Sequence, residues 1–162
     1  MILRIDFRGL KNLISRLGQI LSRLRDWPSG TQGDIGASLR TLIRTQMDSE
    51  GRSSGSPWAP LSLRYSGWKS RRYSSRKILQ RGGSLYTTFT RKGGIQAITF
   101  GQGGSVNGIE FKIGGPDVSY WRFHQYGAPN ANLPQRQIIP QPLPDGFISG
   151  VRDIVGRYII KG

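Results

Sequence analysis

The segment WAPLSLRYSGWKSRRYSSRKIL, residues 58–79, concentrates aromatic rings and positive charge in a short part of the chain. It contains two Trp, two Tyr and six Lys or Arg, and it contains no Asp or Glu. Its apolar residues keep neither the helical period of about 3.6 residues nor the two-residue period of a strand. The sequence therefore predicts a long extended basic arm over residues 51–82, with a flexible lead-in at 51–57 and a helical turn at 74–80.

The positive charge of the whole chain is concentrated around this arm. The 162 residues include 24 Lys or Arg and 9 Asp or Glu, which gives a net charge of +15. Residues 51–109 hold ten of these bases and no acid. Such a distribution favours a polyanionic partner, either nucleic acid or the acidic surfaces of other proteins. A solvated basic face that keeps the protein soluble is the plainer alternative.

Two amphipathic helices are predicted before the arm. Between residues 3 and 25 the apolar positions are spaced alternately by four and three residues, which produces one narrow apolar seam. WPSG at 27–30 ends this helix, and a second helix is predicted from about 32 to 50 with Thr31 as its N-cap. The short Pro-Gly turn between them predicts an antiparallel helical hairpin over residues 1–50.

Residues 83–162 are predicted to form an α+β core after the arm. In chain order, the predicted elements are a short helix capped by Ser84, strands at 95–100 and 109–113 joined by the loop GQGGSVNG, a short aromatic helix at 120–127 that ends at Gly127, an extended proline-punctuated stretch at 129–144, and a last helix capped by Asp145. The expected fold class is α+β in a single domain, residues 1–162. A small antiparallel sheet is expected to carry the C-terminal helix on one face.

The residue inventory gives little support for catalysis or metal binding. The chain has no Cys and one His, which excludes disulfides, Cys-based zinc sites and His-rich metal sites. The acids are scattered, without the cluster that a two-metal nuclease needs. The lone His124 lies among aromatic residues, where a structural role is favoured. We therefore expect no enzyme activity, no catalytic or metal-binding residue, no cofactor and no small-molecule substrate.

The sequence contains no signal for a membrane. No apolar run approaches the roughly 20 residues that a membrane-spanning helix needs. The first residues, MILRIDFRGLKNLISRL, lack the uninterrupted apolar region of a signal peptide. We expect no membrane partner, and a protein that is made in the cytoplasm.

Four short motifs follow one another along the chain. They are W-x-P-L-S at Trp58, Pro60, Leu61 and Ser62; K-I-L-x-x-x-G-x-L at Lys77, Ile78, Leu79, Gly83 and Leu85; Y-x-x-x-H-Q-x-G at Tyr120, His124, Gln125 and Gly127; and P-x-R at Pro134 and Arg136. In this order, over about residues 56–160, they resemble the phage virion-morphogenesis family, the tail-completion or neck proteins of tailed phages. The chain departs from the family pattern at Trp121, Gly82 and Ile138 or Ile139, where a small residue, a Thr and an aromatic residue are usual.

The resemblance implies a non-enzymatic structural subunit of the virion neck or tail, assembled in the cytoplasm of the bacterial host. It implies a ring, most often of six copies, at the head–tail junction, where the ring completes the tail and joins it to the connector around the DNA passage. The implied partners are other copies of the chain, the neighbouring connector and tail-tube proteins, and, nonspecifically, the genomic double-stranded DNA in the lumen. The ring number, the neighbours in contact and the tail type stay open.

A second hypothesis from a different class stays beside this one. Arg and Lys contact phosphates, and aromatic rings stack on unpaired bases. The chain could therefore be a small cytoplasmic nucleic-acid-binding protein whose basic aromatic loop holds single strands. A monomer whose DNA affinity falls steeply with salt would favour this alternative.

Two sets of residues are expected to make the contacts. The basic arm facing partners or DNA consists of Arg64, Lys69, Arg71, Arg72, Arg76, Lys77 and Arg81; the interface anchors are Trp58, Pro60, Leu61, Trp68, Tyr120, Trp121, His124 and Arg136. We expect some of the cations to face acidic neighbouring subunits and others to face the DNA passage.

Two of the motif positions carry a more specific expectation. The planar guanidinium of Arg136 suits an ion pair between elements or between subunits. By the resemblance, His124 and Gln125 form a buried polar pair that fixes the turn at Gly127, so that the segment Pro134–Arg136 can dock.

Overall fold

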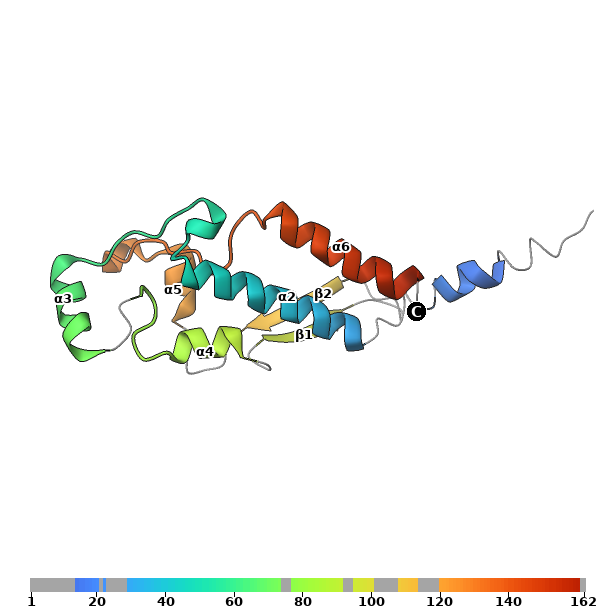
Figure 1. Cartoon of the computed structure of the whole chain (residues 1–162), viewed down its shortest axis with the longest axis horizontal. Coiled ribbons are helices and arrows are strands. Elements are labelled where there is room, and N and C mark those ends of the chain that lie inside the picture. The colour runs from blue at the N-terminus through green and yellow to red at the C-terminus, as the bar shows by residue number, and fades with distance from the viewer. Residues whose placement is uncertain are drawn as a thin grey trace, which may run out of the picture.

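The computed structural model describes residues 14–20, 22, 29–73, 77–91, 95–100, 108–113 and 120–160. Its elements in chain order are α2 (Ser29–Asp48), the 3-10 helix η1 (Arg52–Ser54), α3 (Leu63–Arg72), α4 (Ser84–Thr90), β1 (Ile95–Phe100), β2 (Gly108–Ile113), α5 (Trp121–Tyr126), the 3-10 helix η3 (Pro129–Ala131) and α6 (Asp145–Ile160). The molecule is elongated, with α2 along its middle and α6 beside it (Figure 1). Helices α4 and α5 lie beside the C-terminal part of α2, and α3 lies beyond that end of α2 (Figure 1).

Helix α2 is the central element of the core. Ile35, Leu39, Ile43 and Met47 follow one another at four-residue intervals, so they share one face of the helix, and all four are buried. The helix ends where Glu50 and Gly51 take positive φ angles of 52° and 87°. The Gly51 N–H then bonds the Gln46 carbonyl at 2.9 Å. The predicted second helix is thus present, although it begins and ends slightly earlier than 32–50.

The core joins α2 to segments from much later in the chain. Its buried cluster consists of Leu39, Ile43, Met47, Trp58, Ile78, Leu85, Phe89 and Ile138. Phe89 of α4 meets Trp121 of α5 edge to face, with ring centroids 5.8 Å apart. Burial of such side chains stabilises a fold by about 1.5 to 3 kcal/mol each. The apolar face of α2 therefore organises the part of the molecule that contains the sequence motifs.

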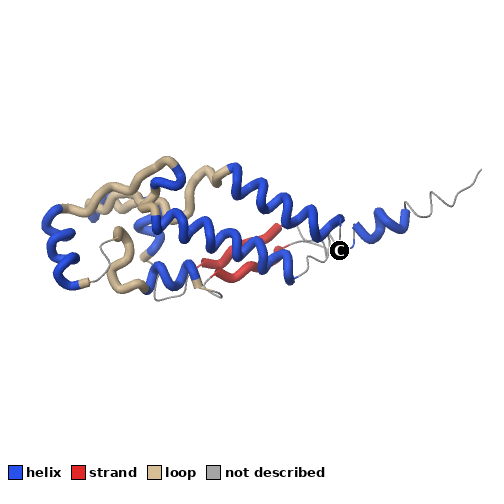
Figure 2. The backbone as a smooth tube through the Cα atoms, in the orientation of Figure 1, coloured by secondary structure: helices blue, strands red, loops and turns tan. Residues whose placement is uncertain are grey.

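The predicted α+β fold class is wrong for this chain. Helices make up most of the described residues, and β1 and β2 pair only with each other, as an antiparallel two-stranded ribbon (Figure 2). Their bounds agree with the predicted strands, but they form no sheet layer. Helix α6 packs along α2, and not on a sheet as expected. A two-stranded ribbon is a marginal structure by itself, whereas the 20 residues of α2 offer a long surface to a second helix.

The expected N-terminal hairpin is also absent from the described residues. Residues 14–20 are helical, but they lie beyond the N-terminal end of α2 and not alongside it (Figure 1). Ile14 and Leu17 of the predicted apolar seam are 61% and 50% exposed. The rest of that seam, residues 1–13 and 21–25, falls largely outside the described residues.

The predicted extended arm contains a helix. Helix α3 begins after Ser62, whose hydroxyl oxygen accepts a hydrogen bond from the Tyr65 N–H at 3.3 Å as an N-cap. Ser62 is a residue type that favours helix starts, so the sequence did contain this signal. A smaller difference concerns α4, whose N-cap is Gly83 at φ 80° and not the predicted Ser84. No helix among the described residues is long and apolar enough to span a bilayer.

Candidate functional site

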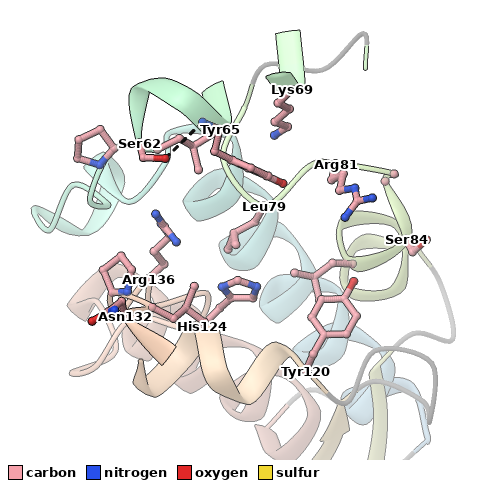
Figure 3. A pocket seen from close by; sticks show the side chains of 17 residues that line it. Ser62, Tyr65, Lys69, Leu79, Arg81, Ser84, Tyr120, His124, Asn132 and Arg136 are labelled. Carbon is pink, nitrogen blue, oxygen red and sulfur yellow. Dashed lines mark hydrogen bonds between the residues drawn. The ribbon is translucent and has the colours of Figure 1, made fainter. Parts of the chain in front are cut away.

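A pocket of about 580 Å³ opens between α3, the loop before α4 and the segment that contains α5 and η3 (Figure 3). All four sequence motifs line it. Their contributions are Pro60, Leu61 and Ser62; Leu79, Gly83 and Leu85; Tyr120 and His124; and Pro134 and Arg136. Residues separated by up to 76 positions thus meet in one place because the fold brings their segments together.

Lys69 is the buried cation on the α3 side of the pocket. Lys69 is only 2% exposed, although it belongs to the arm that was predicted to face partners or DNA. Its ammonium group donates a hydrogen bond to the backbone carbonyl of Lys77. Burial lowers the pKa of Lys69, and the nearby Glu50 carboxylate opposes this effect. Lys69 therefore fastens α3 to the segment that follows it.

The acid-free segment receives negative charge from the two acids that precede it. The Lys77 ammonium lies 3.2 Å from the Asp48 carboxylate and 3.2 Å from the Asp48 carbonyl oxygen. The Glu50 carboxylate accepts a hydrogen bond from the Ile78 N–H at 2.7 Å. The arm thus folds back on the C-terminal end of α2, where carbonyl groups favour cations. Part of its charge is satisfied within the chain.

The aromatic side chains of α3 pack on one another. Trp68 lies between Tyr65 and Tyr73, with ring centroids 5.5 and 5.6 Å away. Arg81 covers this cluster, with its guanidinium carbon 5.2 Å from the Trp68 ring centre. Arg81 also donates a hydrogen bond from Nε to the Tyr73 hydroxyl at 3.0 Å, which raises the pKa of Arg81. These rings therefore contact one another and Arg81, although Trp68 is still 36% exposed.

Arg136 enters the pocket as a buried cation without a carboxylate. It is 5% exposed, and its Nε donates to the Ala59 carbonyl at 3.2 Å. Among the described residues, no carboxylate lies within 4.0 Å of the guanidinium. Burial lowers the pKa of Arg136. The expected ion pair is thus not formed within the described part of the chain, and a pair between subunits stays a prediction.

His124 lies beside Arg136 at the floor of the pocket. The Arg136 backbone N–H bonds the His124 carbonyl at 2.6 Å, and the Tyr120 ring meets the imidazole edge to face. The Nδ1 atom of His124 is buried and has no hydrogen-bond partner among the residues that the structure describes. Burial, followed by the charge of Arg136, lowers the pKa of His124. The imidazole is therefore neutral near pH 7.

Two buried glutamines hold residues 137–139, a segment whose Ile138 belongs to the buried core. The Gln125 side-chain oxygen accepts the N–H groups of Ile138 and Ile139 at 2.8 and 3.0 Å, and its amide donates to the Ile139 carbonyl at 2.8 Å. The Gln46 amide donates to the Gln137 carbonyl at 3.0 Å, and the Trp58 indole N–H reaches the same oxygen at 3.0 Å. This segment is thus fixed by side chains from α2, from α5 and from the loop before α3.

The structure places the predicted arm residues in different environments. Lys69 and Arg81 line the pocket, Lys77 pairs with Asp48, Arg64, Arg71 and Arg72 are exposed on α3, and Arg76 lies outside the described residues.

The predicted anchors also divide. Pro60, Leu61, Tyr120, His124 and Arg136 line the pocket, Trp58 is buried in the core, Trp121 packs against that core, and Trp68 belongs to the aromatic cluster. Sequence reasoning missed Gln46, whose only signal is its place beside Met47 on the buried side of α2. It also missed Tyr65, which lines the pocket.

Comparisons with known proteins give one result. The model of the phage virion morphogenesis family matches residues 5–143, a range that includes all four motifs and every residue that lines the pocket. No curated protein and no solved structure shows significant similarity to the chain. The described residues also contain no group of three or more His, Cys, Asp or Glu that could hold a metal ion.

Proposed function

The chain belongs to the phage virion morphogenesis family, and from this premise we propose that it forms a ring at the head–tail junction of a tailed-phage virion. The family itself is structural and places the protein in virion morphogenesis. In the proposal, the ring completes the tail and joins it to the connector around the DNA passage. Six copies are expected from the family resemblance described above.

The convergence of the four motifs on one pocket is the observation that carries this proposal. The pocket is lined by three cations, Lys69, Arg81 and Arg136, and by no carboxylate. A shaped, charged hollow at one end of the molecule suits contact with another protein. The described lining of the pocket contains no carboxylate for acid–base chemistry, so its composition supports a docking role more than a catalytic one.

The exposed face of α3 supports a place inside an assembly. Arg64, Arg71 and Arg72 are exposed there, and no described carboxylate pairs with them. Like charges that are packed so closely repel one another in an isolated chain. In the proposed ring, acidic surfaces of neighbouring subunits or the phosphates of the passing DNA neutralise them.

The single-strand-binding alternative has less support from the aromatic residues. Such binding needs exposed ring faces on which bases stack. Trp58 is buried in the core, and Trp68 is flanked by Tyr65, Tyr73 and Arg81. We therefore keep this alternative as an outcome of the test.

The ring is tested with the purified chain by light scattering at low and high salt, combined with electron microscopy. We expect a discrete mass of several copies and closed rings in the images. A monomer at both salt concentrations that binds single-stranded DNA, and that loses this binding after Trp68→Ala, would establish the alternative.

The place at the head–tail junction is tested in the phage that carries the gene. Without the protein we expect filled heads and separate tails in the lysate, and joined particles when the wild-type chain is supplied. We expect the Arg71→Glu, Arg72→Glu double variant to restore joining poorly. The matched control is Arg152→Glu, which reverses an exposed arginine on α6. If the phage that lacks this protein still produces joined, infectious particles, the proposal is contradicted.

A further inference from the structure

We propose that the pocket binds a carboxylate-bearing peptide segment of a neighbouring virion protein, and that Arg136 is its principal anion-binding residue. This inference rests on the proposed function and names the chemistry of the partner that the ring contacts. It concerns the empty space bounded by Lys69, Arg81, His124 and Arg136 (Figure 3).

The state of Arg136 is the main argument. Arg136 is only 5% exposed, and the burial of a charged side chain is costly unless an opposite charge or hydrogen bonds compensate it. Within the described residues, Arg136 has one side-chain hydrogen bond, from Nε to the Ala59 carbonyl. Its two terminal nitrogens have no partner there. A carboxylate bound in the pocket would accept these N–H groups in the paired geometry that guanidinium groups favour.

The other charges of the pocket have the same sign. Lys69 reaches it from α3, Arg81 from the loop before α4, and Arg136 from the segment after η3, so that the cations surround the space from three sides (Figure 3). No Asp or Glu belongs to the lining. The pocket therefore selects an anion by charge complementarity.

The rest of the lining favours a peptide over nucleic acid. Leu61, Leu79, Leu85 and Leu133 contribute apolar surface, and Pro60 and Pro134 add more. A phosphodiester backbone offers only its sugar carbons to such a surface, whereas a peptide offers acidic side chains and large apolar side chains together. A volume of about 580 Å³ is also in the range of pockets that enclose a compact ligand. Duplex DNA would meet exposed cations such as those on the outer face of α3.

His124 provides a specific reporter of binding. It lines the pocket, and it is the only histidine of the chain. In protein labelled at histidine, the two ring C–H signals therefore report on this site alone. The probe is the end-blocked pentapeptide Leu-Glu-Leu-Glu-Leu, and its matched control is Leu-Gln-Leu-Gln-Leu. We expect a saturable shift with the Glu peptide and a rise in the pKa of His124, because a bound carboxylate stabilises the imidazolium.

Two variants identify the residues responsible. We expect Arg136→Gln to weaken binding of the Glu peptide by tenfold or more, because hydrogen bonds between a guanidinium and a carboxylate are stronger than those between neutral groups. Arg136 is buried, so its variant can also perturb the fold. Arg81→Ala changes an exposed residue at the rim of the same pocket, and we expect it to weaken binding severalfold with the fold intact. Arg152→Gln on α6 should bind as the wild type does.

The outcomes separate the inference from the proposed function. Equal binding of the Gln peptide, or no shift of His124 with the Glu peptide, would overturn the inference. The inference would also be overturned if the His124 signals shifted with a 12-base-pair DNA duplex or with inorganic phosphate but not with the Glu peptide. The pocket would then be a phosphate-binding site. Ring formation and head–tail joining are measured independently, so rings without peptide binding refute only the inference. Peptide binding by a chain that forms no ring refutes only the proposed function.

Discussion

The two ends of the molecule are stabilised by different interactions. The pocket end comprises residues 46–73, 77–91 and 120–140, where buried polar side chains bind backbone groups of distant segments. The helix-pair end comprises the N-terminal half of α2 together with α6, where Ile35 and Ile154 are buried and Tyr158 donates one hydrogen bond to Asp34 at 3.2 Å. Hydrogen bonds require particular atoms at particular positions, whereas apolar contact requires only shape and volume.

This difference agrees with the positions of the four sequence motifs, which line the pocket. Residues such as Gln125, Trp58 and Gly127 lie at the pocket end, and each satisfies a geometric requirement that another residue type would not meet. The helix-pair end needs only apolar residues in the right register, so it carries no diagnostic motif. Four substitutions with their controls test this contrast, from the largest expected effect to the smallest.

Gln125→Leu should cause the largest loss of stability. The substitution removes the hydrogen-bond partner of three backbone groups near the core. They are the N–H groups of Ile138 and Ile139 and the carbonyl of Ile139. Each unsatisfied buried group costs about 1 to 3 kcal/mol, so for the three groups we expect a loss of about 3 to 9 kcal/mol in the free energy of unfolding, measured by urea denaturation. Gln141→Leu, at an exposed position, is the control and should change stability by less than about 0.5 kcal/mol. Similar losses in both variants would mean that the pocket end does not depend on this amide.

Gly51→Ala and Gly55→Ala form a matched pair in one loop. Both glycines have positive φ angles, 87° and 75°. A Cβ atom at Gly51 would lie 2.4 Å from the Ser56 carbonyl oxygen and 2.6 Å from the Trp58 ring, whereas at Gly55 it would meet nothing within 4 Å. We expect a loss of about 2 to 4 kcal/mol for Gly51→Ala and about 1 kcal/mol for Gly55→Ala in the free energy of unfolding. An equal effect would show that the close approach to Trp58 adds nothing to the backbone strain.

The third comparison places one conservative change at each end. Ile154→Leu keeps the volume at the helix-pair end and should cost less than about 1.5 kcal/mol. Trp58→Phe removes the indole N–H that the Gln137 carbonyl accepts and should cost more than Ile154→Leu, about 2 to 3 kcal/mol, because packing and a hydrogen bond are lost together. Thermal unfolding followed by circular dichroism compares the two. The reverse order would contradict the contrast between the ends.

The smallest expected effect is a dependence on pH at the pocket end. The pKa of His124 is lower in the folded chain than its ordinary value of 6.5, chiefly because of burial. The unfolded chain therefore binds a proton more readily, so stability is complete above about pH 6.5 and decreases as the pH falls below it. Urea denaturation between pH 5 and 8 measures this. His124→Gln should remove the dependence in this range, since the chain has no other histidine, and an unchanged dependence would assign it to other groups.

Much of the local structure could be predicted from the sequence. The apolar period of α2, the two strand segments, and the short helix α5 with its end at Gly127, at φ 77°, agree with the predictions. The motif order also predicted the family that the comparison confirms. Helix α3 was missed because its sequence lacks an apolar stripe, and its inward residue is a lysine. A cation that bonds a carbonyl 8 residues later has no periodic signature.

By itself, the sequence therefore determined the features that depend on residues close together in the chain. Helix and strand segments, a turn at a glycine and the net charge all follow from residues within a few positions of each other. The fold class, the partial neutralisation of the arm by Asp48 and the pocket were decided by the tertiary structure. They depend on contacts such as those of Gln46 and Trp58 with the Gln137 carbonyl, across 91 and 79 positions. Such contacts form when complete helices pack, because burial of their apolar faces brings distant polar groups together. A local pattern of residues therefore does not predict them.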